Sequence, residues 1–164
     1  MKVLMPFLLL LFVVACSSPQ EEETVKEEID ENYDPILSPY FLIVDALVND
    51  DFEGVKKYGN MVSKANSDTG VKLALVRMGT LISQASSTYD QRAVMKQFGM
   101  VIPLYIDASV LNSYPIYKFK CKNEFDGKEV FWLSLSKNSK NPFIGGNSNE
   151  CVDLVETIEP VLNK

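Results

Sequence analysis

The spacing of apolar residues changes once in the body of this chain, at Tyr114-Pro115. Before this point apolar residues recur every three or four positions, which is typical of amphipathic helices. After it they alternate with polar residues, as in half-buried strands. The order predicts an α+β fold, mainly α, in which an up-down bundle of about four helices precedes a small antiparallel β hairpin or sheet.

The first two helices are expected on either side of Asn49. Ser38-Pro39 predicts the start of the first helix, because Ser can cap a helix and Pro is tolerated at the first helical position. Asp50, with Glu53 three residues later, resembles a capping box and predicts the start of the second helix. The inner faces of these helices are expected to carry Tyr40, Phe41, Val44, Leu47, Val48, Phe52, Val55, Gly59 and Val62.

Two more helices follow a break at residues 66–70. The third covers residues 71–85 and has a strongly apolar face. The fourth begins after the capping cluster Ser86-Ser87-Thr88. Pro103 lies inside its apolar pattern, so a kink, or an early stop and restart, is expected near this residue.

The strand region predicts a hairpin around Asp126-Gly127, which is a strong turn signal. One face of the first strand carries Tyr117, Phe119 and Cys121, and the other carries Lys118, Lys120 and Lys122. Residues 137–150 are rich in Asn, Ser, Gly and Lys and predict a long loop. Val152, Leu154, Glu156 and Ile158 predict a short last strand.

The first 34 residues have the composition of an export signal and a tether. The apolar run at 3–15 is shorter than the roughly 20 residues that a membrane-spanning helix needs. It ends in Val-Val-Ala before Cys16, which resembles a bacterial lipoprotein signal in which Cys16 is lipidated. An ordinary signal with an incidental Cys, or an N-terminal anchor helix, is the alternative. Residues 16–34 then predict an acidic disordered tether, and residues 35–164 a single domain.

The net charge of −6 belongs to the tether, since basic and acidic side chains are equal in number from Pro35 onward. A neutral body argues against nucleic-acid binding, because it has no positive excess for phosphates. The chain contains no His, the usual general base and a common metal ligand, so we expect no enzymatic activity and no catalytic residue.

The second half of the chain resembles a domain family of unknown function. This family occurs as standalone bacterial lipoproteins and as a domain appended to periplasmic adaptor subunits of copper/silver efflux pumps. Its pattern is a Tyr, then Cys-Pro-Met, Trp-Leu-Ser, Asn-Pro-Tyr-x-Gly, a Met, and Cys-Gly. The matching positions here are Tyr117, Cys121, Trp132-Leu133-Ser134, Asn141-Pro142-Phe143-Ile144-Gly145 and Cys151, while residues 46–51 and Gln91-Arg92 resemble the family's helical part.

The chain departs from this pattern at three places. Lys122-Asn123 replaces Pro-Met, Ser148 stands about where the second Met belongs, and Val152 replaces the last Gly. The soft ligands expected of a copper site are thus reduced to the sulfurs of Cys121 and Cys151.

Two interpretations of these cysteines remain open. In a chain exported from the cytoplasm, Cys121 and Cys151 are most simply a disulfide. The alternative is a site for Cu(I) or another soft metal, formed by two thiolates. Trp132 points away from the Phe131 and Leu133 face, so it is either covered by the 137–150 loop or exposed as part of a partner surface with Asn141, Pro142 and Phe143.

Two hypotheses for function follow. The resemblance implies an accessory lipoprotein of heavy-metal efflux or stress, which binds copper or silver weakly or contacts an efflux component. The loss of the Met positions favours a structural or protein-interaction lipoprotein with a disulfide and no metal binding. Both place the chain in the bacterial cell envelope, outside the cytoplasm and attached by lipid to the outer membrane or a periplasmic face.

Overall fold

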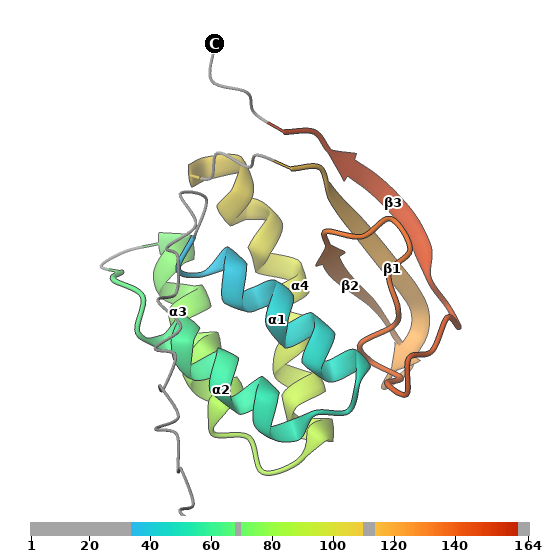
Figure 1. Cartoon of the computed structure of the whole chain (residues 1–164), viewed down its shortest axis with the longest axis horizontal. Helices are drawn as coiled ribbons and strands as arrows, with labels where there is room; N and C mark the ends of the chain where they lie inside the picture. Colours follow the sequence, from blue (N-terminus) through green and yellow to red (C-terminus); the bar gives the residue numbers. More distant parts are fainter. Residues whose placement is uncertain (1–33, 68–69, 110–113, 161–164) are drawn as a thin grey trace, which may run out of the picture.

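Along the described part of the sequence, the four helices come first and the three strands of the sheet follow (Figure 1). The computed structural model describes residues 34–67, 70–109 and 114–160. Over these ranges the elements are α1 (Leu37–Val48), α2 (Phe52–Ser63), α3 (Gly70–Ser83), α4 (Thr88–Ser109), β1 (Ile116–Phe125), β2 (Lys128–Ser134) and β3 (Asp153–Ile158). This order confirms the predicted fold class, α+β and mainly α. No helix within the described ranges combines the length and apolar character needed to cross a bilayer.

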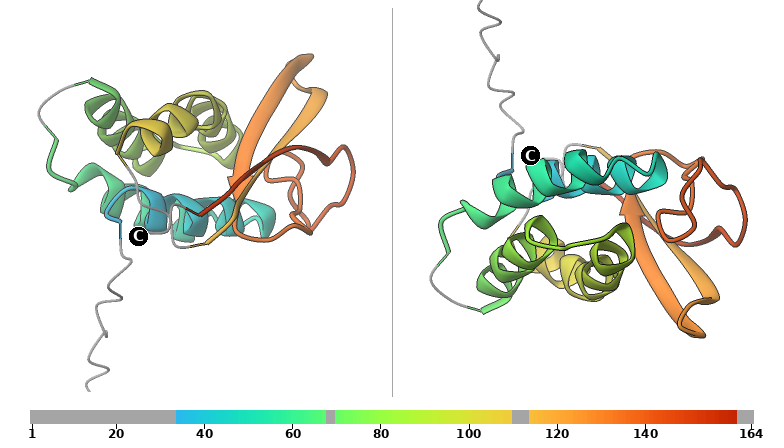
Figure 2. Two further views of the ribbon diagram at one scale, coloured as in Figure 1. Left: turned by 90° about the horizontal axis from the view of Figure 1, so that it is seen from above. Right: turned by 90° about the horizontal axis from the view of Figure 1, so that it is seen from below.

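The helices lie in two layers, with α1 and α2 in one and α3 and α4 in the other (Figure 2). Consecutive helices pack against each other, as the predicted up-down bundle requires. Val55, Gly59 and Val62 are buried on α2, and Leu75 and Ile82 on α3. These positions follow the helical spacing of the sequence.

The start of α1 differs from the prediction. Ser38 is not the capping residue, because the Asp34 carboxylate accepts hydrogen bonds from the amides of Ile36 (2.8 Å) and Leu37 (2.6 Å). Pro39 lies in the first turn, where its missing N–H breaks no helical bond. Asp34 also accepts a hydrogen bond from the hydroxyl of Tyr105 on α4 at 2.8 Å, so it belongs to the folded body and not to the tether.

The start of α4 is as predicted. The Ser87 hydroxyl oxygen accepts a hydrogen bond from the Asp90 amide, and the Ser86 and Ser87 hydroxyls donate to the Asp90 carboxylate. This reciprocal pattern is a capping box with Asp in place of Glu. Pro103 lies inside a single uninterrupted helix, so the expected early stop and restart is wrong.

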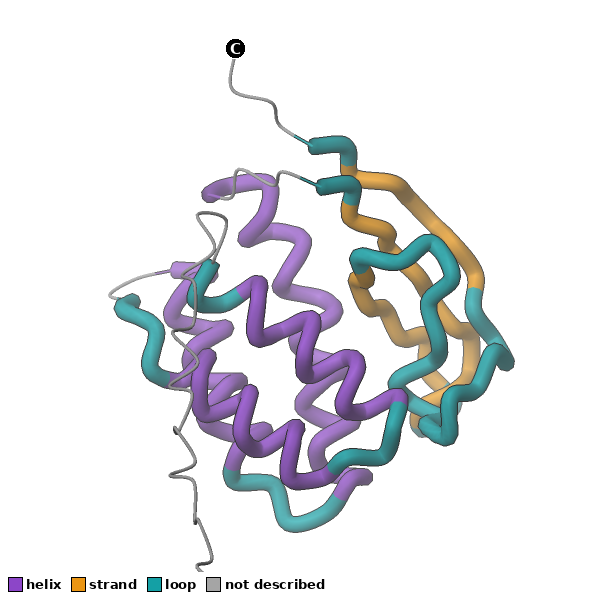
Figure 3. The backbone as a smooth tube through the Cα atoms, in the orientation of Figure 1, coloured by secondary structure: helices purple, strands orange, loops and turns teal. Residues whose placement is uncertain are grey.

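The sheet contains the predicted hairpin and the predicted last strand. Asp126 and Gly127 have φ values of 54° and 68°, the left-handed pair that a two-residue hairpin turn needs. The strand order is β2-β1-β3, with antiparallel pairing throughout. Residues 135–152, which we call the cover loop, connect β2 to β3 and lie across the sheet (Figure 3).

Helices α1 and α4 cover the outer edge of β2. The backbone amide of Leu133 donates to the hydroxyl of Tyr40 on α1 at 3.0 Å. On α4, Gly99 faces the backbone carbonyl of Phe131 so closely that a Cβ there would collide with the carbonyl oxygen. These contacts protect one edge of the sheet and fix its position relative to the bundle.

Candidate functional site

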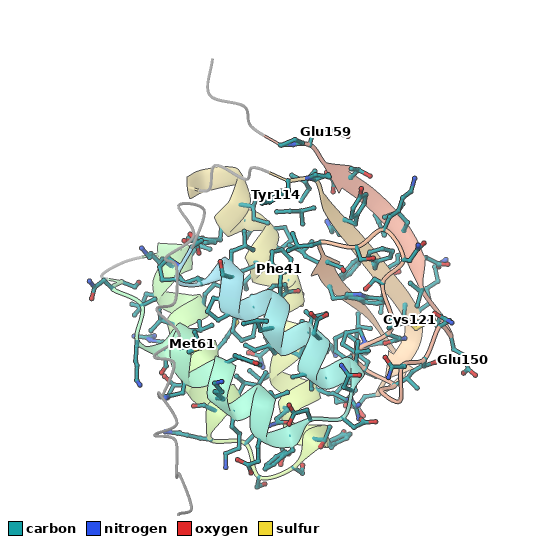
Figure 4. All side chains as sticks on the ribbon, viewed as in Figure 1. Phe41, Met61, Tyr114, Cys121, Glu150 and Glu159 are labelled. Carbon is teal, nitrogen blue, oxygen red and sulfur yellow. A yellow bond between two sulfur atoms is a disulfide. The ribbon has the colours of Figure 1, made fainter. Side chains whose placement is uncertain are left out.

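The sulfur atoms of Cys121 and Cys151 are joined in a disulfide. Cys121 lies on β1 and Cys151 at the end of the cover loop, with their Cα atoms 5.1 Å apart. Figure 4 shows Cys121 beside the loop that carries Glu150. The predicted disulfide is confirmed, and in this state neither sulfur is a thiolate available to a metal. The described residues also contain no cluster of three or more His, Cys, Asp or Glu side chains suited to a metal ion.

Trp132 is fully buried beneath the cover loop. Its ring stacks on Phe119 with centroids 5.7 Å apart, and it makes a T-shaped contact with Phe143 at a centroid distance of 6.2 Å. The indole N–H donates to the Ser139 hydroxyl oxygen at 2.9 Å. Of the two alternatives for Trp132, coverage by the loop is therefore correct, and an exposed aromatic surface formed with Phe143 is wrong.

Asn141 organises the cover loop from its interior. Its side chain is fully buried. The amide oxygen accepts a hydrogen bond from the Phe143 backbone amide at 2.9 Å, which forms a tight local turn. The amide nitrogen lies 3.1 Å from the carbonyl of Glu150 and 3.4 Å from that of Cys151, so it also binds the far end of the loop. All polar atoms of this side chain are used to shape the loop.

Arg92 joins the cover loop to the helices. From α4 its Nε donates to the carbonyl of Pro142 at 2.9 Å. Its Nη2 donates to a carboxylate oxygen of Asp50 at 2.6 Å and to the carbonyl of Leu47 at 3.3 Å. The other Asp50 oxygen accepts from the Gly146 amide at 2.8 Å. One ion pair thus links α1, α4 and the cover loop.

Gly145 sits directly against this ion pair. Its φ is +80°, and a Cβ at this position would collide with the Asp50 carboxylate and the Arg92 guanidinium. Both the backbone conformation and the close approach require glycine. The Asn-Pro-Phe-x-Gly segment is therefore a docking turn, in which Gly145 lets the loop approach the helices.

The prediction that Asp50 caps α2 is wrong. The capping residue is Asp51, whose carboxylate accepts from the Gly54 amide at 2.9 Å. Asp50 has a φ of 55° and directs its carboxylate to Arg92 and the cover loop. Local spacing does not reveal this role, because Arg92 is 42 positions away along the chain. The one sequence signal was that both positions belong to segments that resemble the same family.

The remaining predicted site residues do not take part in the contacts that hold the cover loop. Tyr117 is half-buried in β1, opposite Ser134 of β2 and Thr157 of β3. Lys118 and Lys120 form ion pairs with Glu156 at 3.7 Å and Glu129 at 3.4 Å. Their side chains are only 25% and 29% exposed, and Lys118 lies opposite the fully buried Leu133, so they do not form a solvated strand face. The predicted signal at 1–15, the lipidation residue Cys16 and the tether through residue 33 lie outside the described residues.

Burial raises the pKa of the Tyr40 hydroxyl well above its usual value, because the charged form would lose its hydration; the hydrogen bond from the Leu133 amide opposes this shift. Tyr40 is therefore neutral at physiological pH. Its hydroxyl oxygen serves as an acceptor at the β2 edge and not as an acid or base.

Comparison of the chain with protein-family models, with characterised proteins and with solved structures finds no match. What this chain does must therefore be inferred from its own residues.

Proposed function

We propose that this chain is a lipid-anchored interaction domain of the bacterial cell envelope, held together by a disulfide and without catalytic activity. The observation that carries the proposal is the Cys121–Cys151 bond. Structural disulfides form and persist in oxidising compartments outside the cytoplasm, where a lipoprotein signal at residues 1–15, cleaved before Cys16, would deliver the domain.

The contacts of the motif residues support a scaffolding role. Trp132 and Phe143 fill the space under the cover loop, and Asn141 joins the loop's Phe143 turn to its far end at Glu150. Pro142 and Gly145 dock the loop on Arg92 and Asp50. Because these groups are used internally, a partner would bind a different surface of the domain.

The anchor is tested by expressing the full chain and a Cys16→Ser variant in a bacterium and analysing the mature N-terminus by mass spectrometry. We expect an acylated Cys16 in the wild type, recovered with the membranes. The Cys16→Ser chain should carry no acyl group. A wild-type chain that is cut elsewhere, or that carries no lipid, would contradict the anchor.

The state of the disulfide is tested by acid quenching of intact cells followed by alkylation with a thiol-reactive polyethylene glycol. We expect Cys121 and Cys151 to react only after reduction. A Cys121→Ala variant supplies the control, because with the Cys16 sulfur acylated its Cys151 is the one remaining thiol and should react without reduction. If Cys121 and Cys151 of the wild-type chain both react without reduction in freshly quenched cells, the proposal is contradicted.

A second candidate function is an accessory role in copper or silver efflux or stress. Two observations favour it: the family resemblance of residues 117–151, and the meeting of both sulfurs at one place, with Cys151 exposed. Reduction would leave two thiolates within reach of one soft ion such as Cu(I). The Cu(I) affinities of the reduced domain and of a Cys121→Ser, Cys151→Ser variant would be measured by competition with a chelator. Equal binding by the two proteins would exclude this site.

A further inference from the structure

The two edges of the sheet differ in their protection. The β2 edge is covered by Tyr40 and α4, as described above. In the part of the chain that the structure describes, β3 pairs with β1 on one side only, and no segment pairs with its other side. Figure 1 shows β3 as the outermost strand. Its Leu154 and Val155 are 43% and 45% exposed, so a six-residue strand presents free backbone groups and apolar side chains together.

A groove adjoins this free edge. It has a volume of about 380 Å³ and lies between the cover loop and strands β1 and β3. Phe119, Val152 and Leu154 supply its apolar lining, and Lys137 and Lys140 line the side formed by the loop. This volume is within the range of sites that hold small ligands or single large side chains.

The charge of the groove is not balanced within the described residues. The lysines of the opposite sheet face, Lys118 and Lys120, each have a carboxylate partner. No carboxylate of the described chain pairs with Lys137 or Lys140, and the Lys140 ammonium donates to the neutral amide oxygen of Asn149 at 2.6 Å. The groove thus combines apolar side chains of β1, β3 and the end of the cover loop with two lysines and neutral polar residues of the loop.

We propose that the free edge of β3 binds an extended peptide segment of a partner protein as a fourth strand. One apolar side chain of the peptide enters the groove over Leu154, and a neighbouring carboxylate binds Lys137 and Lys140. Backbone hydrogen bonds to a sheet edge supply affinity in such complexes, and pockets for alternate side chains supply specificity. This inference deepens the interaction role proposed above and rests on it.

The face of β3 that the peptide would use is compatible with an acidic side chain. Leu154 pairs with Phe119, whereas Glu156 pairs with Lys118, the next residue of β1, and therefore points to the opposite face. The negative charge of Glu156 is already engaged with Lys118 on that face.

A second copy of the chain is a poorer occupant. Antiparallel pairing of β3 with itself, in the register centred between Leu154 and Val155, would bring Asp153 of one copy against Glu156 of the other. Like charges across neighbouring strands are destabilising. Lys137 and Lys140 of the groove instead offer positive charge to a partner of different sequence.

The first experiment selects peptides from a phage-displayed library of random sequences on the purified mature protein with its disulfide intact. We expect enriched peptides to carry an apolar residue beside an acidic one. A fluorescent peptide made from the enriched set should bind a Lys137→Glu, Lys140→Glu variant about tenfold more weakly or worse. Leu154→Glu should abolish binding.

Matched controls place the same changes elsewhere on the surface. Lys128→Glu reverses an exposed charge at the hairpin turn, and Leu81→Glu changes a 54% exposed leucine on α3. Both should bind the peptide within twofold of the wild type. Thermal unfolding checks that every variant is folded. If Leu154→Glu is unfolded, the Lys137→Glu, Lys140→Glu variant still tests whether the groove binds the peptide.

Strand addition is tested separately with N-methylated peptides. Only alternate amides of an added strand face the protein, so methylation of one alternating set should abolish binding while methylation of the other set should not. Backbone amides of β3 should also exchange more slowly with solvent in the complex.

The inference would be overturned by a library without enrichment, by binding that the control variants weaken as much as the groove variants, or by equal tolerance of both methylated sets. Self-association in sedimentation that Leu154→Glu removes would assign the edge to a second copy, and the peptide proposal would fall. None of these results affects the lipid and disulfide tests above, so failure of this inference is distinguishable from failure of the proposed function.

Discussion

Asp50 and Arg92 lie 42 positions apart in the sequence and meet at 2.6 Å. Their side chains do more than neutralise each other, because each also binds the cover loop. Arg92 donates to the carbonyl of Pro142, and Asp50 accepts from the amide of Gly146. The Arg92 side chain is 14% exposed and that of Asp50 is 50% exposed, so solvent screens only part of this pair.

A double-mutant cycle on this pair is therefore expected to show a measurable coupling. Arg92→Ala and Asp50→Ala should each destabilise the fold by about 1–2 kcal/mol, with a coupling energy of about 1 kcal/mol. Urea denaturation measures both quantities. The exposed pair Lys56 and Glu53, 4.0 Å apart, serves as the control and should show a coupling near zero. Equal coupling in the two pairs would mean that Asp50 and Arg92 do not hold the loop.

Gly99→Ala is expected to destabilise the protein although alanine favours helices. The added methyl group would strike the backbone carbonyl of Phe131, which cannot move without displacing β2. Overpacking of this kind costs about 1–3 kcal/mol, against a gain of about 1 kcal/mol in helix propensity. The free energy of unfolding in urea gives the net effect. Met100→Ala at the neighbouring position, which is 64% exposed, should change stability little. A stabilised Gly99→Ala protein would refute the close contact.

Removal of the disulfide should lower stability by about 3.5 kcal/mol in the chain-entropy account, because the bond closes a loop between residues 30 positions apart. A Cys121→Ala, Cys151→Ala variant is compared with the oxidised wild type by urea denaturation. Reductant should destabilise the wild type and leave the variant unchanged. If the oxidised wild type and the variant have the same free energy of unfolding, the bond does not stabilise the fold.

Trp132 is the chain's single tryptophan, so its fluorescence reports on the space under the cover loop. Phe143→Ala removes the ring that makes the edge contact with Trp132 and should cost about 3–4 kcal/mol. It should also shift the emission to longer wavelength, because water reaches the indole. Ile82→Ala on α3 is the control, since Ile82 is fully buried where α3 packs against Gly59 of α2 and should destabilise without moving the emission. An unchanged emission in Phe143→Ala would argue that the loop does not cover Trp132.

The cap of α4 should depend on pH. Hydrogen bonds from the Ser87 and Ser86 hydroxyls lower the pKa of the Asp90 carboxyl below its usual value. A carboxyl with a lowered pKa stabilises the fold above its unfolded pKa, and this stability is lost as the pH falls through the folded pKa. Asp90→Asn should therefore be less stable than the wild type at pH 7, with a difference that shrinks below about pH 4. Thermal unfolding across pH measures it. The difference should be much smaller in a Ser86→Ala, Ser87→Ala background, and a pH-independent difference would contradict the assignment.

Local sequence patterns were enough to predict the secondary structure and its order. The period change at Tyr114-Pro115 separates the helices from the strands, and Asp126-Gly127 marks the hairpin. Helical spacing and left-handed turns depend on residues a few positions apart, so the sequence displays them directly. The pairing of Cys121 with Cys151 was predictable because the chain offers few alternatives.

By itself, the sequence determined the element types, their order, the hairpin turn and the cross-linked pair, because each rests on short-range pattern or on composition. Tertiary structure alone decided that Asp50 binds Arg92 and does not cap α2, that the helices protect the β2 edge, and that the β3 edge is exposed. These features join groups that are dozens of residues apart. Their partners are chosen by how the bundle, the sheet and the cover loop pack in space, and no local spacing records that choice.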